Sequence, residues 1–295
     1  MSAGAVTPEP DHHAAAAERA GVVIRELAGL AELALVDGLF AGIWGPAGGQ
    51  VAMPVNLLQA LVHSGNYVAG AWRGSTLVAA AVAFLGSHPG PGAHDGATEL
   101  HSHVAGVARS EQGTGVGLAL KLHQRDWARA RGVATITWTY DPLIRRNGWF
   151  NLVALGATAT DYLPDFYGPM LDELNGTDET DRCLVRWGTA DPFSRSASAA
   201  PGAADADVDV DAGTMLEAGP GGEPGILGRE PDGRPLLCQV PPDVVALRRS
   251  DPALARRWRL ALRDTMGRAM AAGYRATSMT GAGAYLLERP ERSDG

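Results

Sequence analysis

Two short stretches of the chain combine residue types and spacings that could do chemistry. In residues 97–108, ATELHSHVAGVA, the side chains of Glu99, His101 and His103 alternate along a strand-like segment. Successive side chains of a strand point to opposite faces, so these three groups share one face. A carboxylate and two imidazoles can exchange protons near neutral pH. The row is a candidate general base, and hydrogen-bonded sheet residues are the alternative interpretation.

The second stretch places glycines at 113, 115 and 117, directly before an amphipathic run that begins at Leu118. Glycine permits unusual backbone angles and close approach of a ligand. A helix N-terminus presents unpaired N–H groups and a partial positive charge, which suits phosphate. The sequence therefore predicts an anion-binding loop at residues 112–118.

Two familiar phosphate-binding patterns fit this loop poorly. The loop of nucleoside triphosphatases needs Lys and then Ser or Thr after its last glycine, where this chain has Leu118 and Ala119. The dinucleotide pattern G-x-G-x-x-G fits Gly113 and Gly115 but puts its third glycine at Leu118. Asp141, after the next strand, stands near the place of a ribose-binding acid. An NAD-dependent oxidoreductase therefore stays open as an alternative.

A third pattern, Q/R-x-x-G-x-G/A between a strand and a helix, is satisfied by residues 112–117, QGTGVG. This stretch resembles the pyrophosphate-binding motif of the GNAT superfamily of N-acyltransferases. The segments ELHSHVAGV, TWTYDPL, RNGWFNLVALGA, YLPDFYG and TDRCLVRW resemble an uncharacterised branch of that superfamily with an extra C-terminal region.

The resemblance implies a co-substrate, acetyl-CoA or another acyl-CoA, and transfer of its acyl group to a small amine or amino acid. It implies that main-chain groups near Val107 and Arg109 bond the pantetheine arm and that the loop's N–H groups hold the pyrophosphate. It also implies that the base comes from the strand of Glu99, His101 and His103. The residues implied to bind the cofactor are Val107, Arg109, Gln112, Gly113, Thr114, Gly115, Val116, Gly117, Leu118, Asn147 and Asn151.

The sequence differs from the family's pattern at the residue that would protonate the leaving thiolate. The family often uses a Tyr four residues before the Gly of a Leu-Gly pair, and aligning on Gly156 puts Leu152 there. Leu152 cannot donate a proton, so Tyr167, or else Tyr162, is the candidate acid, with packing as the alternative role. The same departure leaves open a CoA-binding protein without transferase activity.

Charged residues after the strand at 133–140 are candidates for the acceptor pocket. Asp141, Arg145 and Arg146 lie there, and an arginine would suit a carboxylate-bearing acceptor such as an amino acid. Solvated loop charges are the alternative.

The elements that must position these residues follow from hydrophobic periodicity. A short turn at 73–75 predicts an antiparallel hairpin. The resulting fold class is mixed α/β (α+β), a mostly antiparallel sheet with helices packed on it. The resemblance implies a GNAT-like domain over residues 21–190, whose splayed central strands are flanked by helices. Strands are expected at 22–27, 67–74, 76–86, 97–108, 133–140 and 182–187, and helices at 31–44, 55–64, 118–132 and 150–157.

The remaining segments differ in composition. Residues 1–20, with His12 and His13, are expected to be a disordered tail, and residues 191–235 a flexible acidic linker. A calcium loop beginning at Asp207 is the alternative for DADVDVD, but Ala212 replaces the glycine that such a loop needs. Residues 236–295 predict a small module, a capped amphipathic helix from about 250 and strands at 277–280 and 284–289, packing on the main domain. Arg256, Arg259 and Arg263 share the helix's polar face, either solvated or facing an acidic partner.

Bulk properties narrow the class of protein. The formal net charge of −8 argues against nucleic acid as a partner. No apolar stretch approaches the roughly 20 residues of a membrane span, and the first residues lack a secretory pattern. The two cysteines, Cys183 and Cys238, form neither a disulfide framework nor a metal-ligand spacing, so we expect no metal and a cytoplasmic protein. The sequence leaves the oligomeric state open, a homodimer included.

Overall fold

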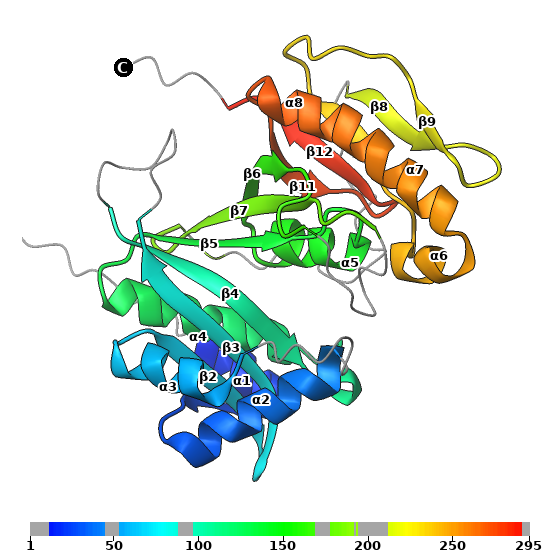
Figure 1. The fold of residues 1–295 in the computed structure, drawn as a ribbon. Coiled ribbons are helices and arrows are strands. Elements are labelled where there is room, and N and C mark those ends of the chain that lie inside the picture. The colour runs from blue at the N-terminus through cyan, green and yellow to red at the C-terminus, as the bar shows by residue number, and fades with distance from the viewer. Residues whose placement is uncertain are drawn as a thin grey trace, which may run out of the picture. The chain divides into compact units, whose positions relative to one another are not determined.

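The computed structural model describes residues 12–44, 53–87, 97–168, 178–191, 193 and 212–290. The chain divides into two compact units. The first takes Met1–Ile43, Val51–Phe84 and Val104–Gly132, and the second takes Trp44–Gln50, Leu85–His103 and Val133–Gly295. Strand β4 (Glu99–Val107) contributes residues to both units (Figure 1).

The first unit contains an antiparallel sheet with helices packed on it. Its strands lie in the order β1 (Val23–Glu26), β2 (Tyr67–Arg73), β3 (Thr76–Gly86) and β4. The predicted hairpin is confirmed, since β2 and β3 pair antiparallel around Gly74, which has a φ of 60°. The helices are α1 (His12–Ala20), α2 (Leu30–Trp44), α3 (Val55–His63) and α4 (Val116–Ala130), of which α3 and α4 pack against β2.

Helix α1 corrects the prediction of a disordered tail for residues 12–20. Ala16, Ala17 and Ala20 are buried, and α1 packs against α4. His13 Nδ1 lies 2.7 Å from Asp126 Oδ2 of α4. Alanine is the strongest helix former, and its small side chain lets two helices approach closely. The alanine run is therefore a packed helix, while residues 1–11 lie outside the described part of the chain.

The second unit contains a longer sheet in the order β4-β5-β7-β6-β11-β12-β10-β8-β9. β4 pairs in parallel with β5 at Leu100 and His101 only, a short ladder for a strand of 9 residues. The β8–β10 pair is also parallel, and the other registered pairs are antiparallel, which confirms the predicted mixed, mostly antiparallel sheet. The strands are β5 (Thr135–Tyr140), β6 (Thr158–Leu163), β7 (Arg182–Gly188), β8 (Gly213–Ala218), β9 (Pro224–Ile226), β10 (Leu236–Gln239), β11 (Arg275–Met279) and β12 (Ala284–Glu288).

The C-terminal helix begins where the sequence predicts. Asp251 is its N-cap, accepting the Leu254 N–H at 2.9 Å, and Pro252 stands at the first helical position. This helix continues through α7 (Pro252–Leu262), the π-helical η4 (Arg263–Gly267) and α8 (Arg268–Ala271), which together pack on β6, β8, β9 and β11 (Figure 1). Its residues Trp258 and Met266 are buried. The other helical segments of this unit are α5 (Arg145–Gly148), the π-helical η3 (Trp149–Ala154) and α6 (Val244–Ser250).

Four strands, β6, β8, β9 and β10, lie where the sequence predicted none. β8 and β9 fall within the expected linker, so that prediction is wrong for residues 212–235; Met215 and Leu216 of β8 are buried. The calcium alternative at 205–211 lies outside the described residues. β6 was also missed, and it joins the C-terminal module to the sheet through the Ala159–Ala276 pair with β11. Within the described residues, no helix combines the length and apolar character that a membrane crossing requires.

Helix α4 buries a lysine. Lys121 is 6% exposed, and its Nζ lies 3.2 Å from Gln124 Oε1. Burial lowers the pKa of Lys121 to about 7. In the unfolded chain a lysine keeps its proton up to a pKa near ~10.4. The unfolded state therefore binds more protons between these two values, and stability rises with pH across that window.

We expect Lys121→Met to raise the free energy of unfolding near pH 7.5, because Lys121 must lose its proton on folding there and methionine carries no such cost. The advantage over the wild type should shrink by about 1.4 kcal/mol per pH unit toward pH ~9.5. Urea unfolding of both proteins across this range measures it. Arg129→Met, an exposed position on the same helix, is the control and should show no such slope. A pH-independent difference for Lys121→Met would contradict the assignment.

Candidate functional site

The glycine loop sets the start of α4 by its backbone angles. Gly113 has a φ of 82° and Gly115, the N-cap of α4, a φ of 91°. A side chain in this left-handed region is strained, so both positions favour glycine. A Cβ on Gly113 would meet no protein atom within 4 Å, so the backbone angle, not crowding, explains this glycine. Gly117 lies inside the first turn of α4 and needs no positive φ.

The first turn of α4 is oriented to receive an anion. The first backbone bond of the helix runs from Ala119 N–H to Gly115 O, at 3.1 Å. The N–H groups of Val116, Gly117 and Leu118 precede it, as at any helix N-terminus. Gly115 has no side chain with which to cap them, and residues 112–115 are exposed. The loop thus leaves the first turn of α4 exposed, and its role in binding an anion stays a prediction.

Two charged residues that the sequence analysis missed hold this loop. Arg73 of β2 donates to both carboxylate oxygens of Glu111, at 3.0 and 2.7 Å, and also to the carbonyls of Ala20 and Gly21. Thr114 Oγ1 donates to Glu111 O at 2.7 Å. Arg73 thus compensates the one carboxylate next to the loop, which would otherwise repel an anion. Because the pair is separated by 38 residues, no local pattern reveals it.

The predicted proton-transfer row lies on the sheet face of the second unit. His101 Nδ1 is 3.2 Å from Thr137 Oγ1, its partner in the β4–β5 register. The rings of His101 and His103 are 6.4 Å apart. The carboxylate of Glu99 forms an ion pair with Arg186, which stands opposite Thr137 in the β5–β7 register. The structure therefore brings the three predicted residues together with Thr137 and Arg186, which the sequence did not single out.

Burial acts on the histidines of this row. It lowers the pKa of His103, so this imidazole is neutral at pH 7 and able to accept a proton. The side chain of His103 still reaches solvent. His103 is thus the member of the row whose protonation state best suits a base.

The two candidate acids differ in accessibility. Tyr167 is 42% exposed, its hydroxyl lies 3.0 Å from Thr139 Oγ1, and Arg182 stacks over its ring. Thr139 and Thr137 share one face of β5, so Tyr167 belongs to the same polar face. Burial raises the pKa of Tyr162 well above its usual value, and its hydroxyl donates to Asp181. Tyr162 is therefore a structural residue, and Tyr167 remains the candidate.

The other residues predicted to contact the cofactor differ in their burial and in their hydrogen-bond partners. Val107 O accepts a bond from Gln112 Nε2 at 3.4 Å, and Arg109 donates to Ile43 O at 3.5 Å. Asn147 is half-buried in α5. Asn151 is buried, and its Oδ1 accepts from Trp138 Nε1 at 3.1 Å. Leu152, at the family's tyrosine position, is a core residue.

The charged residues predicted to line the acceptor pocket are largely engaged elsewhere. Arg145 donates to Gly281 O, and Arg146 is exposed on α5. Asp141 is 5% exposed and accepts from Arg248 at 2.7 Å and from Arg259 at 2.9 and 3.0 Å. Asp141 therefore serves the fold, which corrects its predicted role at an acceptor.

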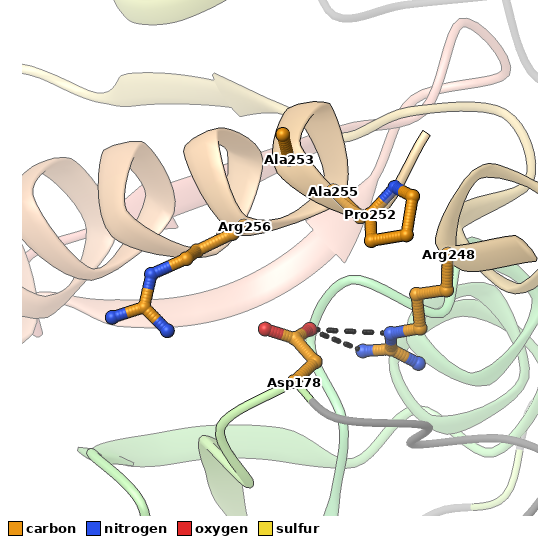
Figure 2. A pocket seen from close by; sticks show the side chains of 6 residues that line it. All are labelled: Asp178, Arg248, Pro252, Ala253, Ala255 and Arg256. Carbon is orange, nitrogen blue, oxygen red and sulfur yellow. Dashed lines mark hydrogen bonds and ion pairs between the residues drawn. The ribbon is translucent and has the colours of Figure 1, made fainter. Parts of the chain in front are cut away.

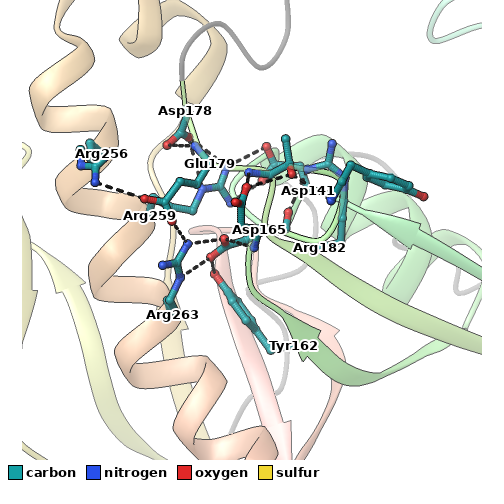
Figure 3. A network of polar contacts seen from close by, with 12 residues as sticks. Asp141, Tyr162, Asp165, Asp178, Glu179, Arg182, Arg256, Arg259 and Arg263 are labelled. Atoms are coloured by element: carbon teal, nitrogen blue, oxygen red, sulfur yellow. Dashed lines mark hydrogen bonds and ion pairs between the residues drawn. The ribbon is translucent and has the colours of Figure 1, made fainter. Parts of the chain in front are cut away.

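Arg259 is the centre of a buried ionic network (Figure 3). It is fully buried and also bonds Asp178, at 3.0 Å. Burial by itself raises the pKa of Asp141, but the contacts with Arg259 and Arg248 prevail and hold that pKa well below its usual range. On the same helix, Arg263 pairs with Asp181 and Glu179, and Arg256 with Glu179. The prediction of a solvated arginine face is therefore wrong for Arg259, because this side chain is fully buried. Its acidic partners, Asp141 and Asp178, belong to this chain.

A pocket of about 230 Å³ adjoins the network (Figure 2). None of the predicted site residues lines it. Asp178 and Arg248, which face it, bond each other at 2.9 Å. The pocket's lining consists of Asp178, Arg248, Pro252, Ala253, Ala255 and Arg256. Among the described residues, no group of three or more His, Cys, Asp or Glu is placed to hold a metal ion.

Taken together, these elements define a mixed α/β protein in which a glycine loop exposes the first turn of a helix. The chain is similar to the solved yncA protein of Salmonella typhimurium with acetyl-CoA, at 18% identity and a TM-score of 0.44, over 60% of this chain and 98% of that chain. It is similar to the ribosomal-protein-S18-alanine N-acetyltransferase of Escherichia coli, at 15% identity and a TM-score of 0.42, over 59% and 98%. It is also similar to Arabidopsis thaliana Naa50 with the bisubstrate analogue CoA-Ac-MVNAL, at 16% identity and a TM-score of 0.42, over 57% and 98%. No protein-family model and no curated protein matched the chain.

We expect Arg259→Met to lower the free energy of unfolding by roughly 3–5 kcal/mol, because it leaves buried carboxylates short of a partner. The control is Arg268→Met, which removes an exposed pair with Glu230 and should change stability by at most about 1 kcal/mol. Chemical denaturation of both variants measures the two effects. Equal, small effects would show that the buried network adds little stability.

Proposed function

We propose that the protein is a CoA-dependent N-acyltransferase that uses acetyl-CoA or another acyl-CoA and acylates a small amine or amino acid. The observation that supports it most is the start of α4, where two left-handed glycines expose the helix's first turn. Strand β4 leads directly into this loop. The same strand also holds the predicted acid–base residues.

The loop binds the pyrophosphate of the cofactor in this proposal. The N–H groups of Val116, Gly117 and Leu118 point along the positive end of the helix dipole, which favours an anion by about 0.3–1 kcal/mol, up to ~2 when partly buried. Charge-assisted hydrogen bonds from the main chain add to this term. Arg73 favours anion binding at this loop because its ion pair with Glu111 compensates the negative charge of that carboxylate.

Acyl transfer then requires a neutral amine. An ordinary alkylamine has a pKa near ~10.4 and is protonated at pH 7, so a base must take its proton. His103, neutral at this pH, takes that proton directly or through water, with His101 held beside it by Thr137. The amine nitrogen forms a bond to the thioester carbonyl carbon and loses its second proton to solvent. The carbon–sulfur bond breaks, and the thiolate is protonated by Tyr167 or solvent.

The alternatives differ in what supports them. A CoA-binding protein without transferase activity is favoured by Leu152 at the tyrosine position. The NAD-dependent oxidoreductase loses its supporting feature, because Asp141 is buried in contact with Arg259 and Arg248. The buried free thiols of Cys183 and Cys238 fit the reducing cytoplasm that we propose as the place of action.

Gly115→Ala should weaken binding of acetyl-CoA at least tenfold, because alanine resists the left-handed angle that exposes the first turn of α4. Gly132→Ala is a matched control: Gly132 follows the other end of α4 with a φ of 70° and has no neighbour within 4 Å of a Cβ, while a Cβ on Gly115 would meet only Ala20 Cβ at 3.9 Å, an ordinary contact. The control should bear similar backbone strain and keep its affinity. Calorimetric titration with acetyl-CoA, CoA and NAD measures both. Binding of NAD without CoA would refute the proposal.

The pH profile of turnover tests the base. Because burial lowers the pKa of His103, the acid limb of the pH profile of kcat/KM should have its midpoint at a pH below ~6.5, the ordinary pKa of a histidine. His103→Gln should reduce kcat about 10²-fold or more, with little change in CoA affinity. His63→Gln, an exposed histidine at the end of α3, is the control. Unchanged turnover in His103→Gln and in His101→Gln would remove this strand from the mechanism.

A further inference from the structure

The ion pair between Glu99 and Arg186 joins two strands that are not neighbours. Glu99 is on β4, Arg186 is on β7, and β5 lies between them. The register places His101 opposite Thr137 and Thr137 opposite Arg186. The pair therefore lies over β5, on the polar face that already holds the two histidines.

The two charged groups differ in exposure, Arg186 being half-buried and Glu99 buried. The side chain of Arg186 is 24% exposed and that of Glu99 is 9% exposed. A guanidinium has five N–H donors and a carboxylate has about four acceptor positions, and their contact joins Arg186 Nη2 to Glu99 Oε1. A ligand on this face thus meets an anion and a cation that touch each other.

The other arginines near this face are less suited to a ligand. Arg182, on the same side of β7, is 8% exposed and stacks over Tyr167. Arg145 bonds the Gly281 carbonyl. Arg186 is consequently the basic side chain best placed for an acceptor's acidic group.

We propose that Glu99 and Arg186 select a free α-amino acid as the acyl acceptor, an inference that rests on the proposed acyltransferase function. An α-amino acid carries its ammonium and its carboxylate on one carbon, so the two charges lie close together. A site that binds both therefore needs an anionic and a cationic side chain that lie next to each other. Arg186 receives the carboxylate in the paired, planar manner that guanidinium groups favour. Glu99 receives the ammonium next to His101 and His103.

The chemical step keeps its balance with this acceptor. One ammonium proton passes to His103, and the freed nitrogen forms the amide bond to the acyl carbon and then loses its second proton to solvent. The thioester's carbon–sulfur bond breaks, and the departing thiolate takes up a proton from Tyr167 or solvent. The substrate carboxylate stays on Arg186 throughout and gains no bond. Arg186 is therefore a specificity-determining residue, whose loss should act on KM more than on kcat.

The test compares each of the twenty standard amino acids with its α-carboxamide, using acetyl-CoA and free-thiol release as the signal. The wild type should prefer at least one acid over its amide by tenfold or more in kcat/KM. Arg186→Gln should bring that ratio close to one, chiefly through KM, and Arg186→Lys should restore part of it. Affinity for acetyl-CoA should not change in either variant. Arg268→Gln is the control and should keep the wild-type ratio.

Because Arg186→Gln leaves Glu99 without its partner, the double variant Glu99→Gln/Arg186→Gln is measured alongside and should also lose the preference. A wild type that acylates amides or simple amines as well as acids would overturn this inference and leave the acyltransferase intact. So would an Arg186→Gln protein that keeps the preference. Thiol release with no amine at all would overturn both.

Discussion

The second unit depends on one buried guanidinium, that of Arg259. Asp141 directly follows β5, Asp181 directly precedes β7, and Asp178 lies in the segment before it. The arginines of α6, α7 and η4 therefore bind next to the ends of these two strands. A buried charge is tolerated only when its partners are in place. The network therefore favours one docking of the C-terminal helix, and with it one register of β5 against β7. That register sets Thr137 opposite Arg186 and so builds the polar face.

The first unit positions its functional groups by a different means. The backbone angles of Gly113 and Gly115 define the start of α4, and the pair of Arg73 and Glu111 holds the loop before it. α1 packs on α4, and His13 bonds Asp126 of that helix. A helix fixed in this way presents its first-turn N–H groups in one orientation, which is what binding a pyrophosphate requires.

The sequence predicts features whose causes are local. Periodicity located most helices and strands, the Asp251-Pro252 pair located the C-terminal helix, and the glycine spacing located the loop. What it missed depends on distant partners. Asp141 and Arg259 are 118 residues apart, and Glu99 and Arg186 are 87 apart, so neither pair leaves a pattern in a sequence window. β8 was missed because its Gly-, Pro- and Asp-rich flanks resemble a linker, although pairing with β10 buries its Met215 and Leu216.

The contact between Glu99 and Arg186 also suggests different roles for Glu99 and His103 of β4 in the proposed mechanism, one in binding the ammonium and one in removing its proton. A carboxylate bonded to a guanidinium would lose a charge-assisted hydrogen bond on taking up a proton, so it serves better as an anion that holds an ammonium than as a base. His103 has the opposite properties: burial favours its neutral form, and its side chain reaches solvent. In the proposed mechanism, holding the ammonium and removing its proton thus fall to different residues of one strand. A single carboxylate doing both would have to exchange its bond to Arg186 for a proton in every turnover.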